Sequence, residues 1–376
     1  MKPWLIYALG GGWGHLNRAV ALGRVAARQR AVTILTNSPY AEQVRVSLKN
    51  SVGDCAFPLH LNIIAADAGF GSTCDWVRQQ ILSLPYQCAI VDTFPRGLGG
   101  ELADLPPQSQ DIPWILVHRD LKPDYVRTKG LRAFVQQFYR AIVIPGDGED
   151  VPFADLPHVY RTAPWLVLNG DELPDRARVR SRLNLPDRQD CDHTPFPDNE
   201  TCQHQAPILM VCAAGQPSEL AFFGRLTAHL CQAFPTAAVR CLAPCRPPHC
   251  PPELWISHWP GMEYLQVADI VIGGAGYNTV HECAALDIPL VNFAFPRLYD
   301  RQARRADWNG YAVQTIPAAI NTLQSLLQQS TYTKILNRIS TYSNGAVSAV
   351  QQIERVIDSL SQQSSRDIDF RYDLEG

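Results

Sequence analysis

The chain has 376 residues, of which 46% are hydrophobic and 18% charged, and its formal net charge at pH 7 is -3. That length suits two domains of about 150 residues or more, each with a core of its own. The 33 Lys and Arg residues are balanced by 36 Asp and Glu residues, which argues against a nucleic-acid partner. No apolar run reaches the roughly 18 residues needed to cross a membrane, so we expect no transmembrane segment.

The amino-terminal segment reads as a buried strand, Trp4–Leu9, rather than as an export signal. Its apolar run is too short for a signal-peptide core, and glycines follow it at once. We therefore expect a cytoplasmic protein whose 11 cysteines are reduced thiols.

Short apolar runs alternate with longer helical stretches in residues 1–163. The runs are apolar throughout, which is typical of parallel strands covered on both faces, and the alternation predicts a doubly wound sheet. The expected strands are Trp4–Leu9, Val32–Thr36, Leu61–Ala65, Cys88–Asp92, Trp114–His118 and Ala141–Ile144, and the expected helices are Asn17–Arg28, Tyr40–Lys49, Cys74–Leu84 and Leu131–Tyr139.

Residues 145–206 are rich in proline and charge, which indicates a linker, with the domain boundary near Pro164, and a surface insertion at 186–206. The strand–helix pattern then restarts. Its expected strands are Ile208–Ala213, Ala238–Leu242, Trp255–His258, Ile270–Ile272, Leu290–Phe293 and Ala312–Gln314, and its expected helices are Glu219–Ala233, Asn278–Leu286, Asp300–Trp308 and Gly345–Ser361. We predict an α/β chain of two Rossmann-like, doubly wound domains, 1–163 and 164–345, facing a central cleft, with 346–376 as a terminal helix and tail.

The first candidate site follows the first strand, where the sequence reads Gly-Gly-Gly-Trp-Gly-His and ends at His15. Glycines let the backbone approach a ligand, and the carboxyl edge of an open α/β sheet is where ligands bind. The imidazole of His15 can take a proton from a hydroxyl group, and Asp92, at the end of another buried strand, can orient it. The alternatives are a plain turn with a structural histidine, and Asp92 as the N-cap of a helix.

The second half offers two glycine turns in front of helices, at Gly215-Gln216 and at Gly274–Thr279. Amides at helix N-termini bind phosphate, and a carboxylate such as Glu282 can accept two hydrogen bonds from ribose hydroxyls. Asp300 and Gln302 supply polar groups for sugar hydroxyls. The candidate nucleotide-sugar ligands are Gly12, Gly14, Gly215, Gln216, Gly274, Gly276, Asn278, Thr279, Glu282, Asp300 and Gln302.

The order Gly-Gly-x-Gly, Thr, Glu, Pro and then Asp-Arg-Gln over residues 273–302 resembles the donor half of the MurG-like N-acetylglucosaminyltransferases. It is also similar to the broader UDP-glycosyltransferases, and both groups have the GT-B fold. The resemblance implies a hexosyltransferase-type enzyme that moves a sugar from a UDP-sugar to an acceptor hydroxyl, with inversion. It implies that His15 is the acceptor-side base, Asp92 its acid partner and Glu282 the ribose ligand. No cofactor besides the donor is expected, and a lipid-linked acceptor would place the protein at a membrane surface.

The loop around His15 departs from the MurG pattern, because Trp13-Gly14 precedes it and Leu16-Asn17-Arg18 follows it. Gly-His-Leu-Asn-Arg is also similar to the nucleotide-sugar hydrolase of pseudaminic acid synthesis. A nucleotide-sugar hydrolase or epimerase of the same fold, or a non-catalytic nucleotide-sugar-binding protein, therefore stays an alternative.

We expect no metal ion. There is no Asp-x-Asp motif near a strand end, and the Cys/His clusters lack the Cys-x2-Cys spacing of common zinc sites. These clusters are Cys191, His193, Cys202 and His204, and Cys241, Cys245, His249 and Cys250.

Overall fold

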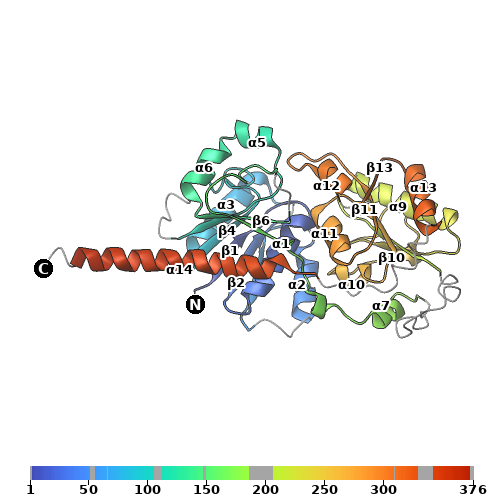
Figure 1. Ribbon diagram of the computed structural model, residues 1–376, viewed down its shortest axis with the longest axis horizontal. Coiled ribbons are helices and arrows are strands. Elements are labelled where there is room, and N and C mark those ends of the chain that lie inside the picture. The colour runs from blue at the N-terminus through green and yellow to red at the C-terminus, as the bar shows by residue number, and fades with distance from the viewer. Residues whose placement is uncertain are drawn as a thin grey trace. The chain divides into compact units, whose positions relative to one another are not determined.

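The computed structural model describes residues 2–50, 56–65, 67–105, 112–146, 150–185, 206–308, 310–328 and 342–372. The chain divides into two compact units (Figure 1). Unit 1 comprises Met1–Val167 and Asn344–Gly376, and unit 2 comprises Leu168–Ser343. The division thus falls slightly after the expected boundary at Pro164. Each unit has one parallel sheet with helices, so the prediction of a two-part, doubly wound α/β chain is confirmed.

The sheet of unit 1 has seven strands in the order β3-β2-β1-β4-β5-β6-β7, and every neighbouring pair is parallel. The strands are β1 (Trp4–Tyr7), β2 (Val32–Thr36), β3 (Leu59–Ile63), β4 (Cys88–Asp92), β5 (Trp114–Val117), β6 (Ala141–Pro145) and β7 (Val159–Thr162). The helices are α1 (Trp13–Ala26), α2 (Ala41–Asn50), α3 (Phe70–Ser83), α5 (Pro123–Thr128), α6 (Leu131–Phe138) and α14 (Gly345–Tyr372).

The strand order of unit 1 reverses direction between β1 and β4. Trp4 of β1 pairs with Val32 of β2 on one side and with Cys88 of β4 on the other. The loops that leave β1 and β4 therefore start side by side at the carboxyl edge. This switch point is where open α/β sheets bind ligands.

Two strands of unit 1 differ most from the expected pattern. β3 begins at Leu59 rather than at Leu61 and is only partly buried, because it is the edge of the sheet. β7 lies in the segment that was expected to be linker. It forms the other edge, next to β6, where a short strand with polar residues such as Arg161 is tolerated.

The last helix, α14, packs on unit 1 and runs along it (Figure 1). Its buried side chains, among them Ala349 and Ile353, meet α1, β6 and β7. Arg30 is 2% exposed, pairs with Glu354 of α14 and lies 4.8 Å from the centre of the Trp4 ring. α14 thus supplies both apolar surface and the counter-ion of a buried cation.

The sheet of unit 2 has six parallel strands in the order β10-β9-β8-β11-β12-β13, with its own switch point between β8 and β11. The strands are β8 (Ile208–Cys212), β9 (Ala238–Leu242), β10 (Trp255–Ile256), β11 (Ile270–Gly274), β12 (Leu290–Phe293) and β13 (Tyr311–Val313). The helices are η1 (Gly170–Glu172), α7 (Arg176–Arg182), α9 (Pro217–Ala233), η3 (Pro252–Leu254), α10 (Met262–Leu265), α11 (Tyr277–Ala285), α12 (Gln302–Trp308) and α13 (Ile316–Gln328).

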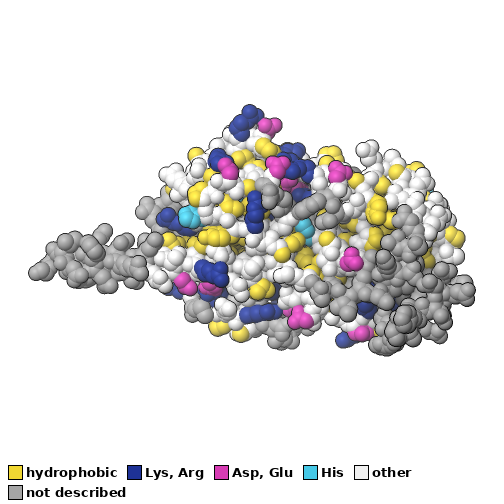
Figure 2. All heavy atoms as spheres, viewed as in Figure 1, with side chains coloured by type: hydrophobic (Ala, Val, Ile, Leu, Met, Phe, Trp, Pro, Cys, Tyr) yellow, Lys and Arg dark blue, Asp and Glu magenta, His cyan; other side chains and the backbone are white. Residues whose placement is uncertain are grey.

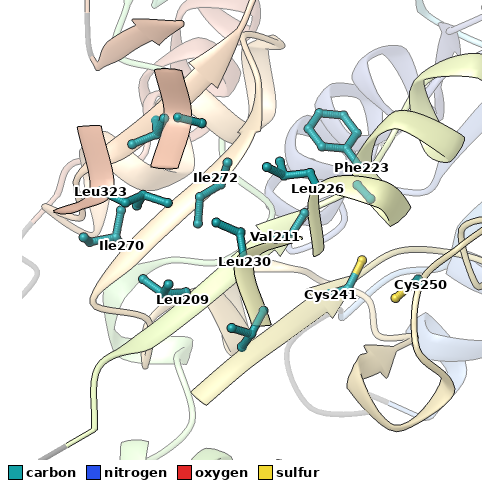
Figure 3. Packing of buried hydrophobic residues seen from close by; sticks show 14 of the residues in the cluster. Leu209, Val211, Phe223, Leu226, Leu230, Cys241, Cys250, Ile270, Ile272 and Leu323 are labelled. Carbon is teal, nitrogen blue, oxygen red and sulfur yellow. The ribbon is translucent and has the colours of Figure 1, made fainter. Parts of the chain in front are cut away.

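The core of unit 2 lies between its sheet and the helices α9 and α13. Figure 3 shows Leu226 and Leu230 of α9 beside Val211 of β8 and Ile272 of β11. The loop between β9 and η3 approaches α9 closely at Gly224, where a Cβ atom would lie 1.9 Å from the Pro248 carbonyl oxygen. The predicted insertion at 186–206 lies outside the described residues, except for Ala206.

Charged side chains of both signs are interspersed on the face shown in Figure 2. The surface ion pairs of unit 1 include Arg78–Asp104, Arg127–Asp124 and Arg132–Asp155. Within the part of the chain that the structure describes, no helix combines the length and apolar character needed to span a bilayer.

Candidate functional site

His15 and Asp92 meet at the switch point of unit 1. Gly12 is the extended N-cap of α1, so His15 lies in the first turn of that helix, whereas the sequence analysis expected the helix to begin only at Asn17. Asp92 is the last residue of β4. The His15 Nδ1 atom lies 2.5 Å from Asp92 Oδ2, and the two side chains are 20% and 2% exposed.

The pKa of Asp92 lies well below its ordinary value. Burial would raise it, but the charges of Arg18 and His15 and the hydrogen bonds from both side chains outweigh burial. An ionised carboxylate can only accept hydrogen bonds, so the Nδ1 atom of His15 carries the hydrogen. Nε2 is then the atom with the free lone pair, which is the form required of a general base.

The His15 ring is held between two uncharged neighbours. A Cβ atom on Gly10 would lie 2.2 Å from His15 Cδ2 and 2.7 Å from Nε2, so only glycine leaves room for the ring. On another side, Phe94 stacks on the imidazole, with ring centroids 5.6 Å apart. The absence of a side chain at Gly10 therefore leaves the space that the His15 imidazole occupies.

Arg18 is a member of this cluster that the sequence analysis did not select. Its Nε donates to Asp92 Oδ1 at 3.0 Å and its Nη2 to Asp92 Oδ2 at 2.7 Å. It lies one turn after His15 on α1, and that spacing places both side chains on the same face of a helix. The spacing was the available signal, but it became informative only once β1 and β4 were known to be neighbours.

The backbone directly after Asp92 is strained. Thr93 has a φ of 73°, in the left-handed region, which is a genuine outlier for a β-branched residue. Its Oγ1 accepts a hydrogen bond from Arg18 Nη2 at 3.3 Å. Strain of this kind concentrates at functional sites, where the surrounding contacts hold it.

The loop that follows Thr93 is anchored by a buried carboxylate. Glu101 accepts hydrogen bonds from the Tyr7 hydroxyl at 2.5 Å and from the Gly99 amide at 2.7 Å. Burial, and then the charge of Glu101, raise the pKa of Tyr7 well above its ordinary value, so Tyr7 remains a donor. The loop is thereby tied to the end of β1, next to the residues that carry the His15–Asp92 pair.

In unit 2, α11 begins directly after a glycine turn. Gly276 is its extended N-cap and makes no side-chain cap in the described part of the chain, and a Cβ atom on Gly276 would meet nothing within 4 Å. Gly274 ends β11, while Asn278 and Thr279 lie in the first turn, where the Thr279 hydroxyl is 3.9 Å from Cys212 Sγ. This arrangement of a strand, a glycine turn and an open helix end can hold phosphate oxygens.

Glu282 of α11 is 7% exposed. Burial raises its pKa to about 7. Among the described residues, no donor forms a hydrogen bond with its carboxylate. Hydrogen bonds from two hydroxyl groups of a ligand would offset the cost of burying this carboxylate in its charged form.

The second predicted phosphate loop is already partly occupied by the protein. Glu219 of α9 accepts a hydrogen bond from the Gln216 amide at 3.3 Å, and this contact closes a capping box. Glu219 also forms a bidentate pair with Arg297, in which the Nη2–Oε2 distance is 2.6 Å. A Cβ atom on Gly215 would lie 3.5 Å from Arg297 Nη2. The amide of Gln216 was expected to bind phosphate, but in the structure it donates to Glu219. The guanidinium group of Arg297 lies beside it.

The two expected sugar ligands have partners inside unit 2. Asp300 pairs with Arg305, and Gln302 Oε1 accepts a hydrogen bond from the Phe295 amide at 3.3 Å. Gln302 is 8% exposed, so its side chain mainly holds the loop after β12. Of the predicted glycines in unit 1, Gly12 is the N-cap of α1, and a Cβ atom on Gly14 would lie 3.4 Å from Arg18 Nη1.

The Cys/His clusters divide between described and undescribed segments. Cys191, His193, Cys202 and His204 lie outside the described residues. Among the described residues, no group of three or more His, Cys, Asp or Glu side chains is arranged to hold a metal ion.

No family model and no curated protein sequence matches this chain. Its structure is similar to that of SsfS6, a glycosyltransferase of Streptomyces sp. SF2575 complexed with thymidine diphosphate, with a TM-score of 0.57, 15% identity and coverage of 94% of this chain and 100% of that chain. TcCGT1 in complex with UDP gives a TM-score of 0.58 at 12% identity over 96% and 99% of the two chains. MurG of Acinetobacter baumannii gives 0.51 at 14% identity over 94% and 100%. The chain therefore has the GT-B fold of glycosyltransferases, as its motifs predicted.

Proposed function

We propose that this protein is a glycosyltransferase that moves a sugar from a UDP-sugar to an acceptor hydroxyl group, with inversion at the anomeric carbon. The observation that carries the proposal is the 2.5 Å contact between His15 Nδ1 and Asp92 Oδ2 at the switch point of unit 1. It leaves Nε2 as a base, the group that a transfer to a hydroxyl requires.

Unit 2 supports the donor half of the proposal. The open N-terminus of α11 suits a diphosphate, and the carboxylate of Glu282 suits the two ribose hydroxyls. Arg297, beside the start of α9, adds a positive charge for the phosphates. TcCGT1 and SsfS6 have UDP and thymidine diphosphate bound, respectively, and we assign UDP here from the motif resemblance.

In the proposed reaction, His15 Nε2 takes the proton of the acceptor hydroxyl as its oxygen bonds to the anomeric carbon. The bond from that carbon to the diphosphate oxygen breaks, and UDP leaves from the opposite face. Its negative charge is met by the amides at the start of α11 and by Arg297, so the scheme needs no divalent ion. Asp92 stabilises the imidazolium ion that forms.

The test measures UDP release from a panel of UDP-sugars, with and without a panel of hydroxyl acceptors. We expect slow release from donor alone and faster release once a suitable acceptor is added. His15→Ala should lower turnover by ~10²–10⁴-fold and leave UDP binding nearly unchanged. The matched control is His60→Ala, which removes an exposed histidine of β3 in the same unit. Full activity in His15→Ala would refute the assignment.

A second candidate is hydrolysis of a nucleotide-sugar, with water in place of the acceptor. The observation that favours it is the sequence Gly-His-Leu-Asn-Arg over residues 14–18, which is similar to the nucleotide-sugar hydrolase of pseudaminic acid synthesis. Steady UDP release from donor alone, unaffected by any acceptor, would identify a hydrolase. Binding of UDP with no release from any donor would identify a non-catalytic binding protein.

A further inference from the structure

Arg18 is a buried cation next to the proposed catalytic base. Its side chain is 3% exposed and sits on α1 one turn after His15. Burying a guanidinium group is costly unless a counter-ion meets it with good geometry. The contacts of Arg18 therefore indicate what this position is built to do.

The guanidinium group binds Asp92 through both carboxylate oxygens, at 3.0 Å to Oδ1 and 2.7 Å to Oδ2. The Oδ2 atom is also the partner of His15 Nδ1 at 2.5 Å. One carboxylate oxygen is thus shared between the base and the cation, and Arg18 Nη2 lies 3.5 Å from His15 Nδ1. The two bonds to Arg18 fix the plane of the carboxylate that orients the imidazole.

The charges of this cluster differ from those of an isolated His–Asp pair. Asp92 favours the protonated imidazole, whereas Arg18, also within reach of the ring, opposes it. Among the described residues, Asp92 from β4 and Arg18 from α1 are the charged groups in contact with the His15 ring, and its neighbours Gly10 and Phe94 are uncharged. The cluster is neutral with His15 unprotonated and carries one positive charge after proton uptake.

We propose that Arg18 is a positioning residue that holds the Asp92 carboxylate in the plane that orients the His15 imidazole, and whose positive charge opposes a second positive charge on that ring. The effect of Arg18 on turnover rests on the proposed function. The electrostatic part can be measured on the protein at rest, through the titration of the His15 ring.

The experiment compares wild type, Arg18→Met and Arg18→Lys. The His15 ring signal is followed by NMR against pH and identified by its loss in His15→Gln. The pH profile of kcat/KM is recorded on the same proteins. Arg78→Met is the matched control, because it removes a bidentate partner of Asp104 elsewhere in unit 1.

We expect the midpoint of the His15 titration to rise by about one pH unit or more in Arg18→Met, with the acid limb of kcat/KM moving by the same amount. Arg18→Lys keeps the charge but loses the bidentate geometry, so its midpoint should stay within about half a unit of wild type while kcat falls. Arg78→Met should change neither.

An unchanged midpoint in folded Arg18→Met would overturn the proposal. If that variant does not fold, a midpoint shift of about one unit or more in Arg18→Lys would overturn it equally. A shifted midpoint in a protein without transferase activity would support the role of Arg18 and refute the proposed function. An unchanged pH profile of kcat/KM in an active Arg18→Met variant would refute the role of Arg18 and support the proposed function.

Discussion

The carboxyl group of Glu282 gives the sharpest test of the proposed donor site, in the variant Glu282→Gln. Burial raises its pKa from the ordinary 4.5 to about 7. A group with a raised folded-state pKa stabilises the fold fully below its unfolded value and loses that contribution as the pH rises through the folded value. The difference between 4.5 and 7 amounts to about 3 kcal/mol in the free energy of unfolding.

Glutamine is close in shape and never ionises, so the variant keeps this contribution at all pH values. We expect wild type and Glu282→Gln to have similar stability near pH 4.5, and the variant to be more stable by up to about 3 kcal/mol above pH 7. Urea denaturation at several pH values measures the difference. The control is Glu253→Gln, which changes an exposed carboxylate of the same unit. A difference between Glu282→Gln and wild type that stays flat from pH 4.5 to 8 would refute the reasoning from burial.

The proposed contact between Glu282 and the ribose makes an opposite prediction for the effect of Glu282→Gln on UDP binding. In Glu282→Gln the negative charge is lost and one of the two acceptor oxygens becomes an NH2 group, which cannot accept from a ribose hydroxyl, so UDP should bind about 10- to 100-fold more weakly. UDP binding to wild type should also release a proton below pH 7, because the hydroxyls require the ionised carboxylate. Calorimetry in buffers of different ionisation enthalpy measures this release. Unchanged UDP affinity in a stabilised variant would leave the burial argument intact and exclude the ribose contact.

The remaining predictions concern backbone positions. Gly10→Ala places a methyl group 2.2 Å from His15 Cδ2, so it should reduce turnover ~10-fold or more, while a UDP thermal shift stays at the wild-type value; normal turnover would contradict the packing. At Thr93, where φ is 73°, glycine should be about 1 kcal/mol more stable than alanine in chemical denaturation, and equal stabilities would argue against strain. Gly224→Ala brings a Cβ atom to 1.9 Å from the Pro248 oxygen and should destabilise by about 1–3 kcal/mol, seen as a lower Tm; an unchanged Tm would contradict this.

Much of the fold could be predicted because buried parallel strands leave a plain record in the sequence. The strands Val32–Thr36, Cys88–Asp92, Ala238–Leu242 and Leu290–Phe293 have the predicted bounds. The predicted start of α1 was wrong. The helix begins at Trp13, but the glycines on both sides of Trp13 are typical of a turn rather than of a helix. The edge strand β7 was missed because its exposure removes the apolar run on which recognition depends, whereas the edge strands β3, β10 and β13 were expected with shifted bounds.

The pairing of His15 with Asp92 could be anticipated, since both follow buried strands that end at one edge. The partners of other polar groups could not. Arg18 reaches Asp92, and Arg297 reaches Glu219, only because the strand order brings distant segments together. For Asp300, the motif identified a polar side chain but could not show that it forms an ion pair with Arg305. Motif spacing thus locates the polar groups, and the tertiary structure decides which of them remain available to a ligand.

The packing of α14 on unit 1 has a consequence for the order in which the protein is made. Unit 1 begins before unit 2 in the chain but is completed after it, because α14 follows the whole of unit 2. Until then, Arg30 lacks the carboxylate of Glu354, and the apolar surface that α1, β6 and β7 offer to α14 stays uncovered. Unit 2 is continuous in sequence, so during synthesis it can reach its final packing before unit 1, which carries His15.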